Sequence, residues 1–591
     1  MIKILMKQIG QYKRDTILTP VFTGLEVLLE ILIPFITAKI IDEGIEAGNM
    51  TRVYQYGLLM LVMAALSLVC GYLAGAFAAR ASSGFACNLR DSMYENIQTY
   101  SFSNIDKFST AGLVTRMTTD VTNLQNASQM IIRIAVRSPL MLIVSMVMCL
   151  VINARLSLIF VAAILVLGCI LFFIMTRTTK IFDQVFSKYD DLNASVQENV
   201  TAIRVVKAFV REDYENEKFT KAAQNLYRLF VKAEKILTYN NPAMMLVVYS
   251  CILALSWFGA RFVTAGSLTT GELTSMFSYV MSILMSLMML SMIFVMVTMS
   301  GASAKRIVQV LTEKPDLANP AKPVTEIPDG SIDFNHVSFS YKSAQTDLTQ
   351  ERKSALQDID LHIRSGETIG IIGGTGCGKS SLVNLVSRLY DVDQGSVCVG
   401  GRNVKEYDME TLRNQVAVVL QKNVLFSGTI LENLRWGNEN ATEEECRQAC
   451  IQACADEFVS QFPDGYNTYI EQGGTNVSGG QKQRLCIARA LLKKPKVLIL
   501  DDSTSAVDTA TDASIRAAFT KSIPGTTKLI IAQRISSVEG ADRILVLDEG
   551  TISGFGTHEE LLETNEIYRD IYETQMNAGG DFDHQTAERR A

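Results

Sequence analysis

The chain of 591 residues has no excess of positive charge, because its formal net charge at pH 7 is −6. Proteins that bind nucleic acid carry basic surfaces that neutralise phosphates, so this balance argues against nucleic acid as a partner. A secretory pattern is also missing at the start. Residues 1–14 are polar and basic and contain no small-residue cleavage site.

Paired cysteines are missing as well. The eleven cysteines are scattered, several of them inside apolar segments, and no two form a CxxC pair. This spacing indicates neither a zinc site nor a disulfide framework. Cys446, Cys450 and Cys454 recur at helical spacing, and packing as small apolar residues explains them better than a metal site does.

Charged residues are scarce in six long stretches of the first half of the chain. Hydrophobic residues make up 48% of the sequence, and their excess lies before residue 305. A membrane span needs about 20 predominantly apolar residues. We therefore expect an all-α transmembrane domain over residues 1–310. Its six expected helices cover residues 16–42, 54–80, 131–154, 156–177, 236–260 and 273–304.

The connections between these spans alternate in length. Residues 80–129 and 177–235 form long, amphipathic connections, and the second carries many lysines and arginines. By the positive-inside rule the long connections, both termini and the second half of the chain are cytoplasmic. We expect a multi-pass protein of the cytoplasmic membrane whose helices continue into the cytosol. They are expected to turn near Gly112 and near residues 209–212.

Two acidic residues, Glu26 and Glu30, lie one helical turn apart inside the first expected span. Intramembrane charges are costly and usually functional, so these two could meet a cationic substrate in a cavity. Alternatively they pair with Arg133 or Arg137, or lie near the lipid headgroups. The sixth span is rich in methionine, which suits an adaptable cavity but is also ordinary packing or lipid-facing material.

Prolines at four positions mark residues 311–330 as a linker. The following residues, 331–575, are typical of an α/β domain. Within it, residues 373–380 fit the pattern GxxxxGK[ST], between a strand at 368–372 and a helical run. The expected phosphate-binding residues are Gly373, Gly374, Thr375, Gly376, Cys377, Gly378, Lys379, Ser380 and Ser381.

This P-loop has a definite chemistry. Its glycines let backbone N–H groups turn towards phosphates, and the helix N-terminus adds its dipole. Lys379 is expected to reach the β and γ oxygens of ATP, and Ser380 is expected to coordinate Mg²⁺. Asp501, which closes the apolar strand at 497–501, is the expected second partner of Mg²⁺.

Further segments indicate a family. Gln421 lies where a Q-loop glutamine is expected, Ser505 to Asp508 is similar to a D-loop, and Tyr341 is placed like an aromatic that stacks on adenine. The chain resembles ATP-binding cassette proteins, and with six spans before one cassette it resembles an exporter-type half-transporter. The residues similar to the family's signature sequence, usually LSGGQ, are Val477, Ser478, Gly479, Gly480 and Gln481.

The resemblance implies a particular assembly. Two cassettes pair head to tail, so that each ATP lies between one P-loop and the signature sequence of the other chain. ATP and Mg²⁺ are the implied cofactors, with Ser380, Gln421 and Asp501 at the metal. Closure and reopening of the cassettes would drive alternating access in the membrane domain.

The chain departs from the family at two positions. Asp502 stands where a glutamate is usual, and Gln533 stands where a histidine is expected. The aspartate is one methylene shorter, so its carboxylate falls short of the water that it must orient. Gln533 cannot carry the charge that a histidine can. Because the signature is intact, we expect a degenerate ATP site in one half of a heterodimer.

These features favour ATP-driven export of amphipathic molecules, with membrane lipid, a hydrophobic or amphipathic substrate and a second half-transporter as partners. The alternatives are a homodimeric lipid or peptide exporter with slow ATPase, an exporter-shaped importer of metal chelates, and a regulatory ATP sensor. Residues 342–353 are expected to form a surface insertion, and residues 576–591 a disordered tail.

Overall fold

The computed structural model describes residues 1–341, 354–502 and 509–576, except for some side chains in three helices. The expected surface insertion, Asp508 and nearly all of the expected tail lie outside these described residues. The chain forms two compact units. Unit 1 contains Met1–Gln98 and Ala111–Glu313, and unit 2 contains Thr99–Thr110 and the chain from Lys314 onwards.

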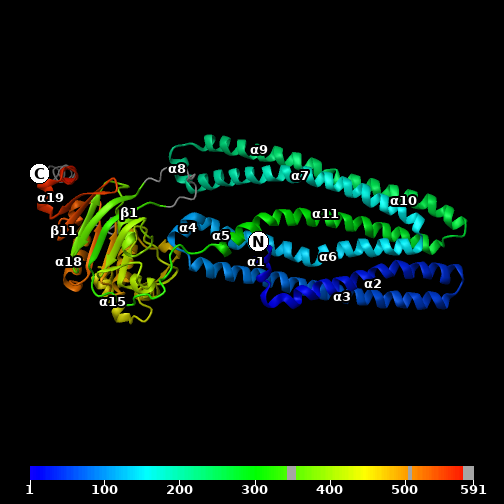
Figure 1. The fold of residues 1–591 in the computed structure, drawn as a ribbon, viewed down its shortest axis with the longest axis horizontal. Coiled ribbons are helices and arrows are strands. Elements are labelled where there is room, and N and C mark those ends of the chain that lie inside the picture. The colour runs from blue at the N-terminus through cyan, green and yellow to red at the C-terminus, as the bar shows by residue number, and fades with distance from the viewer. Residues whose placement is uncertain (342–353, 503–508, 577–591) are drawn as a thin grey trace. The chain divides into compact units, whose positions relative to one another are not determined.

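Unit 1 is entirely helical (Figure 1). Its described residues include six helical stretches long and apolar enough to cross a membrane, which confirms the expected fold class. The helices are α1 (Ile2–Lys7), α2 (Lys13–Lys39), α3 (Met50–Gln98), α5 (Thr110–Thr115), α6 (Val121–Ile152), α7 (Ala154–Thr201), α8 (Ile203–Ala208), α9 (Glu212–Thr238), α10 (Asn240–Thr264) and α11 (Thr270–Thr312). Shorter helical turns are η1 (Gly10–Tyr12), η2 (Ile40–Glu46) and η3 (Arg116–Asp120).

The two long connections turn through short helices. The second turn lies close to the expected place, with α8 between α7 and α9 and a positive φ at Val210. The expectation for Gly112 is wrong, because this residue lies within α5. The first turn is instead made by α4 (Phe102–Phe108), whose capping box at Ser101 and positive φ at Ser109 end the helix on both sides.

A buried carboxylate ties two parts of unit 1 together. Asp120, in η3, accepts hydrogen bonds from Ser303 Oγ at 2.8 Å and from Arg306 Nε at 2.7 Å, both on α11. The Asp120 side chain is almost fully buried, whereas Arg306 remains partly exposed. A buried charge is tolerable only when it is paired and hydrogen-bonded, so this cluster fixes α11 against the start of α6.

Unit 2 contains an α/β domain with three sheets. The strands are β1 (Ile332–Phe339), β2 (Leu356–Ile363), β3 (Thr368–Gly373), β4 (Gln394–Val399), β5 (Arg402–Asn403), β6 (Val416–Val419), β7 (Gly428–Thr429), β8 (Tyr469–Ile470), β9 (Val497–Asp501), β10 (Thr527–Ile531), β11 (Arg543–Asp548) and β12 (Thr551–Gly556). The helices are α4, α12 (Lys379–Val386), α13 (Met409–Gln415), α14 (Ile430–Arg435), α15 (Glu443–Gln452), α16 (Asp456–Val459), α17 (Gly479–Leu491), α18 (Thr509–Ser522) and α19 (His558–Thr564). The 3-10 turns are η4 (Gly465–Asn467), η5 (Gln472–Gly474) and η6 (Ile535–Ser537).

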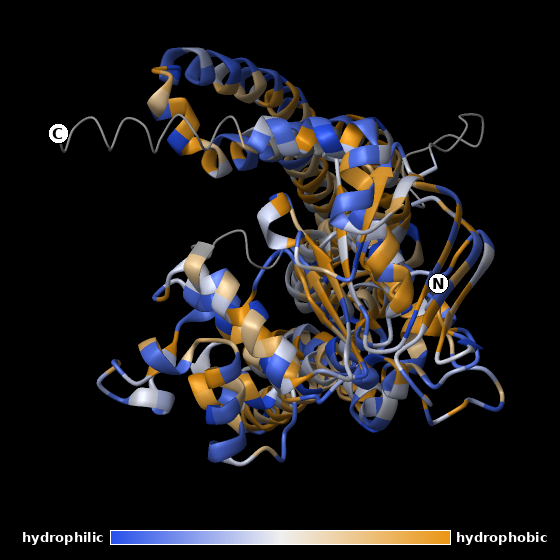
Figure 2. Cartoon of the chain, turned by 90° about the vertical axis from the view of Figure 1, so that its left-hand side faces the viewer, coloured by the Kyte–Doolittle hydropathy of each residue, from blue (hydrophilic) through white to orange (hydrophobic). Residues whose placement is uncertain are grey.

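The larger sheet has the strand order β12-β11-β3-β10-β9-β6, and all of its strands except β12 are parallel to their neighbours. Every residue of β9 and β10 is buried, as expected for strands covered on both faces. Figure 2 shows hydrophobic residues running along the strands of this unit. The smaller sheet, β2-β1-β4-β5, is antiparallel.

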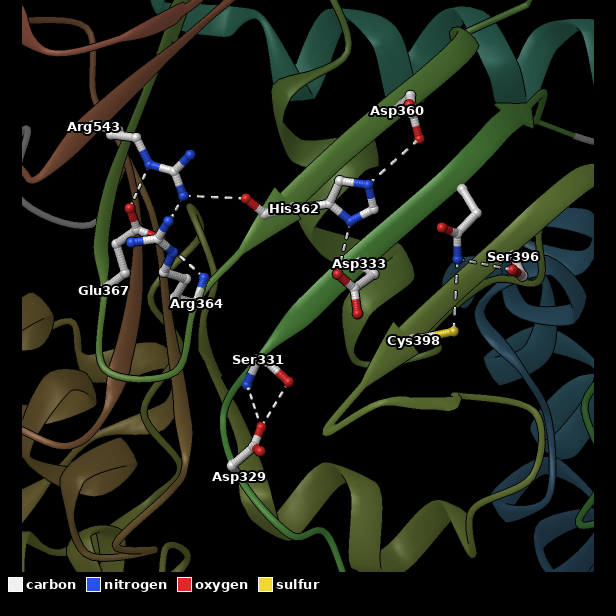
Figure 3. A network of polar contacts seen from close by, with 11 residues as sticks. Asp329, Ser331, Asp333, Asp360, His362, Arg364, Glu367, Ser396, Cys398 and Arg543 are labelled. Carbon is white, nitrogen blue, oxygen red and sulfur yellow. Dashed lines mark hydrogen bonds and ion pairs between the residues drawn. The ribbon is translucent and has the colours of Figure 1, made fainter.

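Polar contacts hold the beginning of β3 in place (Figure 3). Glu367, just before β3, forms an ion pair with Arg543 at the start of β11, with Arg543 Nη2 2.6 Å from Glu367 Oε2. Burial opposes ionisation of Glu367, but the Arg543 guanidinium holds the pKa of Glu367 below its usual value. On the smaller sheet, His362 Nδ1 lies 2.8 Å from Asp333 Oδ1 on the neighbouring strand. The first pair anchors the strand that leads into the P-loop.

Replacing Asp120 by alanine should destabilise unit 1. The change removes the carboxylate that Ser303 and Arg306 share, and we expect the thermal unfolding midpoint to fall by about 3 °C, as a loss of about 2 kcal/mol would produce in a unit of this size. Circular dichroism in detergent measures this shift. Asp191→Ala is the matched control, because it removes an exposed ion pair with Lys188. Equal midpoints for both variants would contradict the role of Asp120.

Candidate functional site

The candidate site lies at the carboxyl edge of three neighbouring parallel strands. The P-loop follows β3, Asp501 closes β9, and Gln533 comes directly after β10, which lies between them. Ile531 of β10 pairs with Asp501 on one side and with Ile371 on the other. Since the carboxyl ends of parallel strands share one edge, these distant segments meet there.

The P-loop has an inner and an outer side. A Cβ added at Gly373 or Gly378 would come within 2.2 and 2.6 Å of backbone oxygens, and both glycines have positive φ. A Cβ added at Gly374 or Gly376 would meet no atom within 4 Å, so this side of the loop is open. The residues present therefore fit a phosphate-binding loop, with packed glycines behind and accessible backbone in front.

The lysine and the serine of the loop are engaged with nearby oxygens. Lys379 Nζ donates to the carbonyls of Gly373 at 2.7 Å and Gly374 at 2.8 Å, so its ammonium lies over the loop. Ser380 Oγ donates to Asp501 Oδ1 at 2.9 Å. A hydroxyl and a carboxylate side by side are the oxygen ligands that Mg²⁺ prefers, so Ser380 and Asp501 could hold the metal together.

Two successive carboxylates are buried at this edge, Asp501 and Asp502. Burial raises the pKa of Asp501, and the neighbouring charge of Asp502 raises it further, while the hydrogen bond from Ser380 and the charge of Lys379 oppose the shift. An incoming divalent cation would stabilise the ionised form of Asp501. The electrostatics therefore suit a metal-bound nucleotide.

The carboxylate of Asp502 is held by amide groups. Gln533 Nε2 donates to Asp502 Oδ2 at 2.7 Å, and Gln421 Nε2 lies 3.4 Å from the same oxygen. Asp502 also has a positive φ of 48°, an uncommon conformation for a residue other than glycine. The backbone of Gln533 is held in turn, because its backbone carbonyl accepts a hydrogen bond from Gln575 Nε2 at 2.8 Å. The structure thus brings Asp502, Gln533 and Gln421 into one cluster.

The signature residues lie at the start of helix α17. Ser478 caps this helix and forms a capping box with Gln481, whose side chain accepts from the Ser478 N–H at 2.9 Å. Val477 precedes this cap, and Gly479 and Gly480 form the first turn. No hydrogen bond among the described residues joins these residues to the P-loop of the same chain. The N-terminus of α17 therefore offers free backbone donors away from this chain's own P-loop.

An aromatic cluster adjoins the expected adenine position. Tyr341 is partly exposed, its hydroxyl lies 2.9 Å from Ser381 Oγ, and its ring is 5.2 Å from that of Tyr390. The Tyr390 hydroxyl donates to Asp106 of α4 at 3.0 Å, and its ring is 6.1 Å from Phe102 of the same helix. Burial, and then the hydrogen bond to Asp106, raise the pKa of Tyr390.

Sequence reasoning missed Tyr390, Asp106 and Gln575. An aromatic residue shortly after the P-loop helix was the only signal for Tyr390, and nothing in the sequence places Asp106 beside it. Cys446 and Cys450 are buried free thiols on α15, but Cys454 does not share their helix face, because α15 ends at Gln452 and Cys454 has a positive φ. The described residues contain no metal-binding cluster of His, Cys, Asp and Glu.

Glu26 and Glu30 both pair with an arginine and line a cavity. Each pairs with Arg137, whose Nη2 lies 2.6 Å from Glu30 Oε2 and whose Nη1 bonds Glu26 Oε1. Both also line a cavity of about 920 Å³ in unit 1, together with methionines of α11 such as Met285. The arginine partner is therefore Arg137 rather than Arg133.

A helical unit with six membrane-crossing stretches and an α/β unit with a P-loop define the class, a membrane protein with a nucleotide-binding domain. Comparison with known proteins agrees. Residues 16–307 match the ABC transporter transmembrane region family, and residues 356–505 match the ABC transporter family. The chain belongs to the ABC transporter family, has an exporter-type architecture, and carries the ATP-binding domain in which these proteins hydrolyse ATP.

Relatives span nearly the whole chain. An uncharacterised ABC transporter ATP-binding protein of Bacillus subtilis, YfiB, is 36% identical, with 94% of this chain and 95% of that protein covered. The ATP-dependent lipid A-core flippase of Hahella chejuensis is 31% identical, with 87% and 86% covered. A bacterial Atm1-family ABC exporter with ATP bound has the same fold, with a TM-score of 0.82 at 23% identity and 95% and 99% covered.

The raised pKa of Asp501 predicts a pH dependence. Asp501 protonates at a higher pH than an ordinary aspartate does, and the protonated carboxyl cannot hold Mg²⁺. As the pH is lowered, the contribution of Mg²⁺ to nucleotide affinity should therefore begin to fall at a higher pH than an ordinary aspartate would give. Titration with a fluorescent ATP analogue, with and without Mg²⁺, measures this contribution at each pH. Asp501→Asn should weaken the Mg²⁺ contribution at pH 8 and reduce its pH dependence to that of Mg²⁺ binding by free ATP; an unchanged profile in this variant contradicts the assignment.

Alkylation of Cys377 should hinder nucleotide binding. Its Sγ is buried in the P-loop, 3.7 Å from Lys379 Nζ, and an added group would displace the loop. We expect full modification with N-ethylmaleimide to weaken ATP affinity about tenfold or more. Cys377→Ala is the control, since this variant is alkylated only at the other cysteines and should keep its affinity. Unchanged affinity after full modification of Cys377 would refute the prediction.

Proposed function

We propose that this chain is one half of a heterodimeric exporter that moves amphipathic small molecules across the cytoplasmic membrane. In this proposal its own P-loop site retains ATP and hydrolyses it poorly. Its signature residues complete the competent site of the partner chain. The observation that carries the proposal is the state of Asp502, whose carboxylate is held by the amides of Gln533 and Gln421.

The residues of this site would divide the work of binding. Lys379 and the P-loop N–H groups would hold the phosphates, Ser380, Gln421 and Asp501 would hold Mg²⁺, and Tyr341 would stack on the adenine. Bound Mg²⁺·ATP would supply the phosphoanhydride whose hydrolysis resets the transporter. Here Asp502 is too short to orient a water well, and Gln533 can donate a hydrogen bond but cannot carry the positive charge of a histidine.

The signature supports a partner with complementary residues. Ser478, Gly479, Gly480 and Gln481 follow the order of the family's signature, and Ser478 caps α17, which supports a role in completing the partner's site. This combination of an intact signature and an altered general base would complement a partner chain that has the usual general base and an altered signature. Occlusion of ATP at one site and turnover at the other is the proposed division of labour.

The placement in the membrane is part of the proposal. We assign residues 1–310 to the transmembrane domain, 311–330 to the linker and 331–575 to the nucleotide-binding domain. Lysines and arginines in the connection at 177–235 support a cytoplasmic position for both termini and for the cassette. The cavity in unit 1, with charged and methionine side chains, supports an amphipathic substrate.

A homodimeric lipid exporter with slow ATPase is the second candidate. The observation in its favour is the 31% identity to a protein named as a lipid A-core flippase. It differs from the first candidate in one respect that can be measured: a homodimer of this chain would have two copies of the altered site, so all of its turnover would come from Asp502.

The ATPase rate of the purified chain, alone and with its co-purified partner, tests the proposal. We expect the chain alone to be nearly inactive and the pair to turn over ATP at an exporter's usual rate. The double variant Asp502→Glu with Gln533→His should raise turnover at this chain's site by about a hundredfold, within the range for general-base catalysis. Lys379→Ala in the same background is the control for binding. A normal rate for the unmodified chain alone would refute the heterodimer and favour the homodimer.

A further inference from the structure

The cavity in unit 1 is walled by α2, α6 and α11. Helices α2, α6 and α11 pack against one another, and Figure 1 shows them running side by side. Residues of α6 at positions 126, 129, 130, 133, 134, 137, 138 and 141 line it, which is the i, i+3, i+4 spacing of one helix face. One face of α6 therefore runs the length of the cavity.

The two acidic residues of the cavity form ion pairs with an arginine of the same chain. Arg137 bonds both Glu26 and Glu30, so one guanidinium bridges two carboxylates on α2. The Glu26 carboxylate is largely buried, and Gly71 of α3 leaves room for it, since a Cβ there would come within 3.0 Å of Glu26 Oε1. Arg137 offsets one of the two negative charges and holds both carboxylates in place, while Glu26 Oε2 is buried without a hydrogen-bond partner.

The other end of the same face is rich in donors. Arg133 lies one helical turn before Arg137, and its guanidinium is next to Gly75 of α3, where a Cβ would be 3.5 Å from Nη1. Among the described residues, the side chain of Arg133 has no hydrogen bond or ion pair. The same holds for Asn126 and Gln129, which line the cavity on the same face. Each of these three side chains can donate N–H groups into the cavity.

An unpaired arginine within a membrane-spanning segment is a candidate contact for an anionic ligand. Guanidinium groups bind planar or tetrahedral oxyanions through two parallel N–H bonds, and amides extend such a site. Opposite this face, α11 contributes methionines, including Met281, Met285 and Met289, whose side chains are partly exposed. Flexible thioether chains can fit apolar groups of varied shape.

We propose that the cavity takes amphipathic anions, with the oxyanion headgroup on Arg133, Gln129 and Asn126 and the apolar part against the methionines of α11. This inference rests on the export function proposed above and specifies its substrate class. Carboxylate, phosphate and sulfonate headgroups share the required chemistry. It also reverses the expectation from sequence that Glu26 and Glu30 meet a cationic substrate.

Binding of radiolabelled decyl phosphate to the full chain in phosphatidylcholine nanodiscs tests the proposal. We expect saturable binding that decyltrimethylammonium does not displace and that inorganic phosphate displaces only weakly, because the apolar part contributes affinity. Arg133→Gln should weaken binding about tenfold or more, and Arg133→Lys should restore part of it. Arg155→Gln is the charge-matched control, since Arg155 is exposed at the start of α7, away from the cavity lining.

Two results would overturn the inference. One is an Arg133→Gln variant that has an unchanged unfolding midpoint and binds decyl phosphate with the same affinity as the unmodified chain. The other is tighter binding of decyltrimethylammonium than of decyl phosphate. ATP-driven uptake into inverted vesicles separates this failure from that of the proposed function. Uptake of a cationic probe alone would retain export and refute the anion site, whereas Arg133-dependent binding without any uptake would retain the site and refute export.

Discussion

The nucleotide site depends on the position of β10 between β3 and β9 in the parallel sheet. This order places the P-loop, the Asp501–Asp502 pair and Gln533 at one edge, although more than 150 residues separate the first from the last. Because every residue of β9 and β10 is buried, neither strand can shift without exposing apolar surface. The ion pair of Glu367 with Arg543 fixes the start of β3 against β11. The packing of the sheet thus determines how the functional residues at this edge are placed.

Helix α4 belongs to the nucleotide-binding unit, although its sequence neighbours α3 and α5 lie in the membrane unit. Tyr390 holds α4 through Asp106 and Phe102, and Tyr390 also contacts Tyr341. Asn104 adds a hydrogen bond to the carbonyl of Lys314 at 3.1 Å. Two aromatic contacts and one hydrogen bond thus connect Tyr341 to α4 through Tyr390, and the chain itself connects α4 to the spans.

Patterns local in sequence predicted much of this molecule. Six apolar runs and a proline-rich linker predict a helical membrane half and a separate α/β half, and the P-loop, Asp501, Asp502 and Gln533 can be placed from strand-and-motif context. Contacts between distant segments could not be predicted. The amide bonds of Gln533 and Gln421 to Asp502, the choice of Arg137 over Arg133 and the Tyr390–Asp106 bond each depend on how separate elements pack. The turn expected at Gly112 failed because a capping box at Ser101 starts a short helix earlier, which glycine content does not reveal.

The central claim is that the site built on this chain's P-loop binds ATP without turning it over. The most direct test is a single-turnover experiment in which the purified chain is loaded with γ-³²P-labelled ATP and Mg²⁺, freed of unbound nucleotide, and assayed over time for bound ATP and released phosphate. The account predicts that the label stays as bound ATP over many turnover times of an ordinary exporter, and that Lys379→Ala retains none. Release of phosphate within one such turnover time would contradict it and show that Asp502 is a competent base.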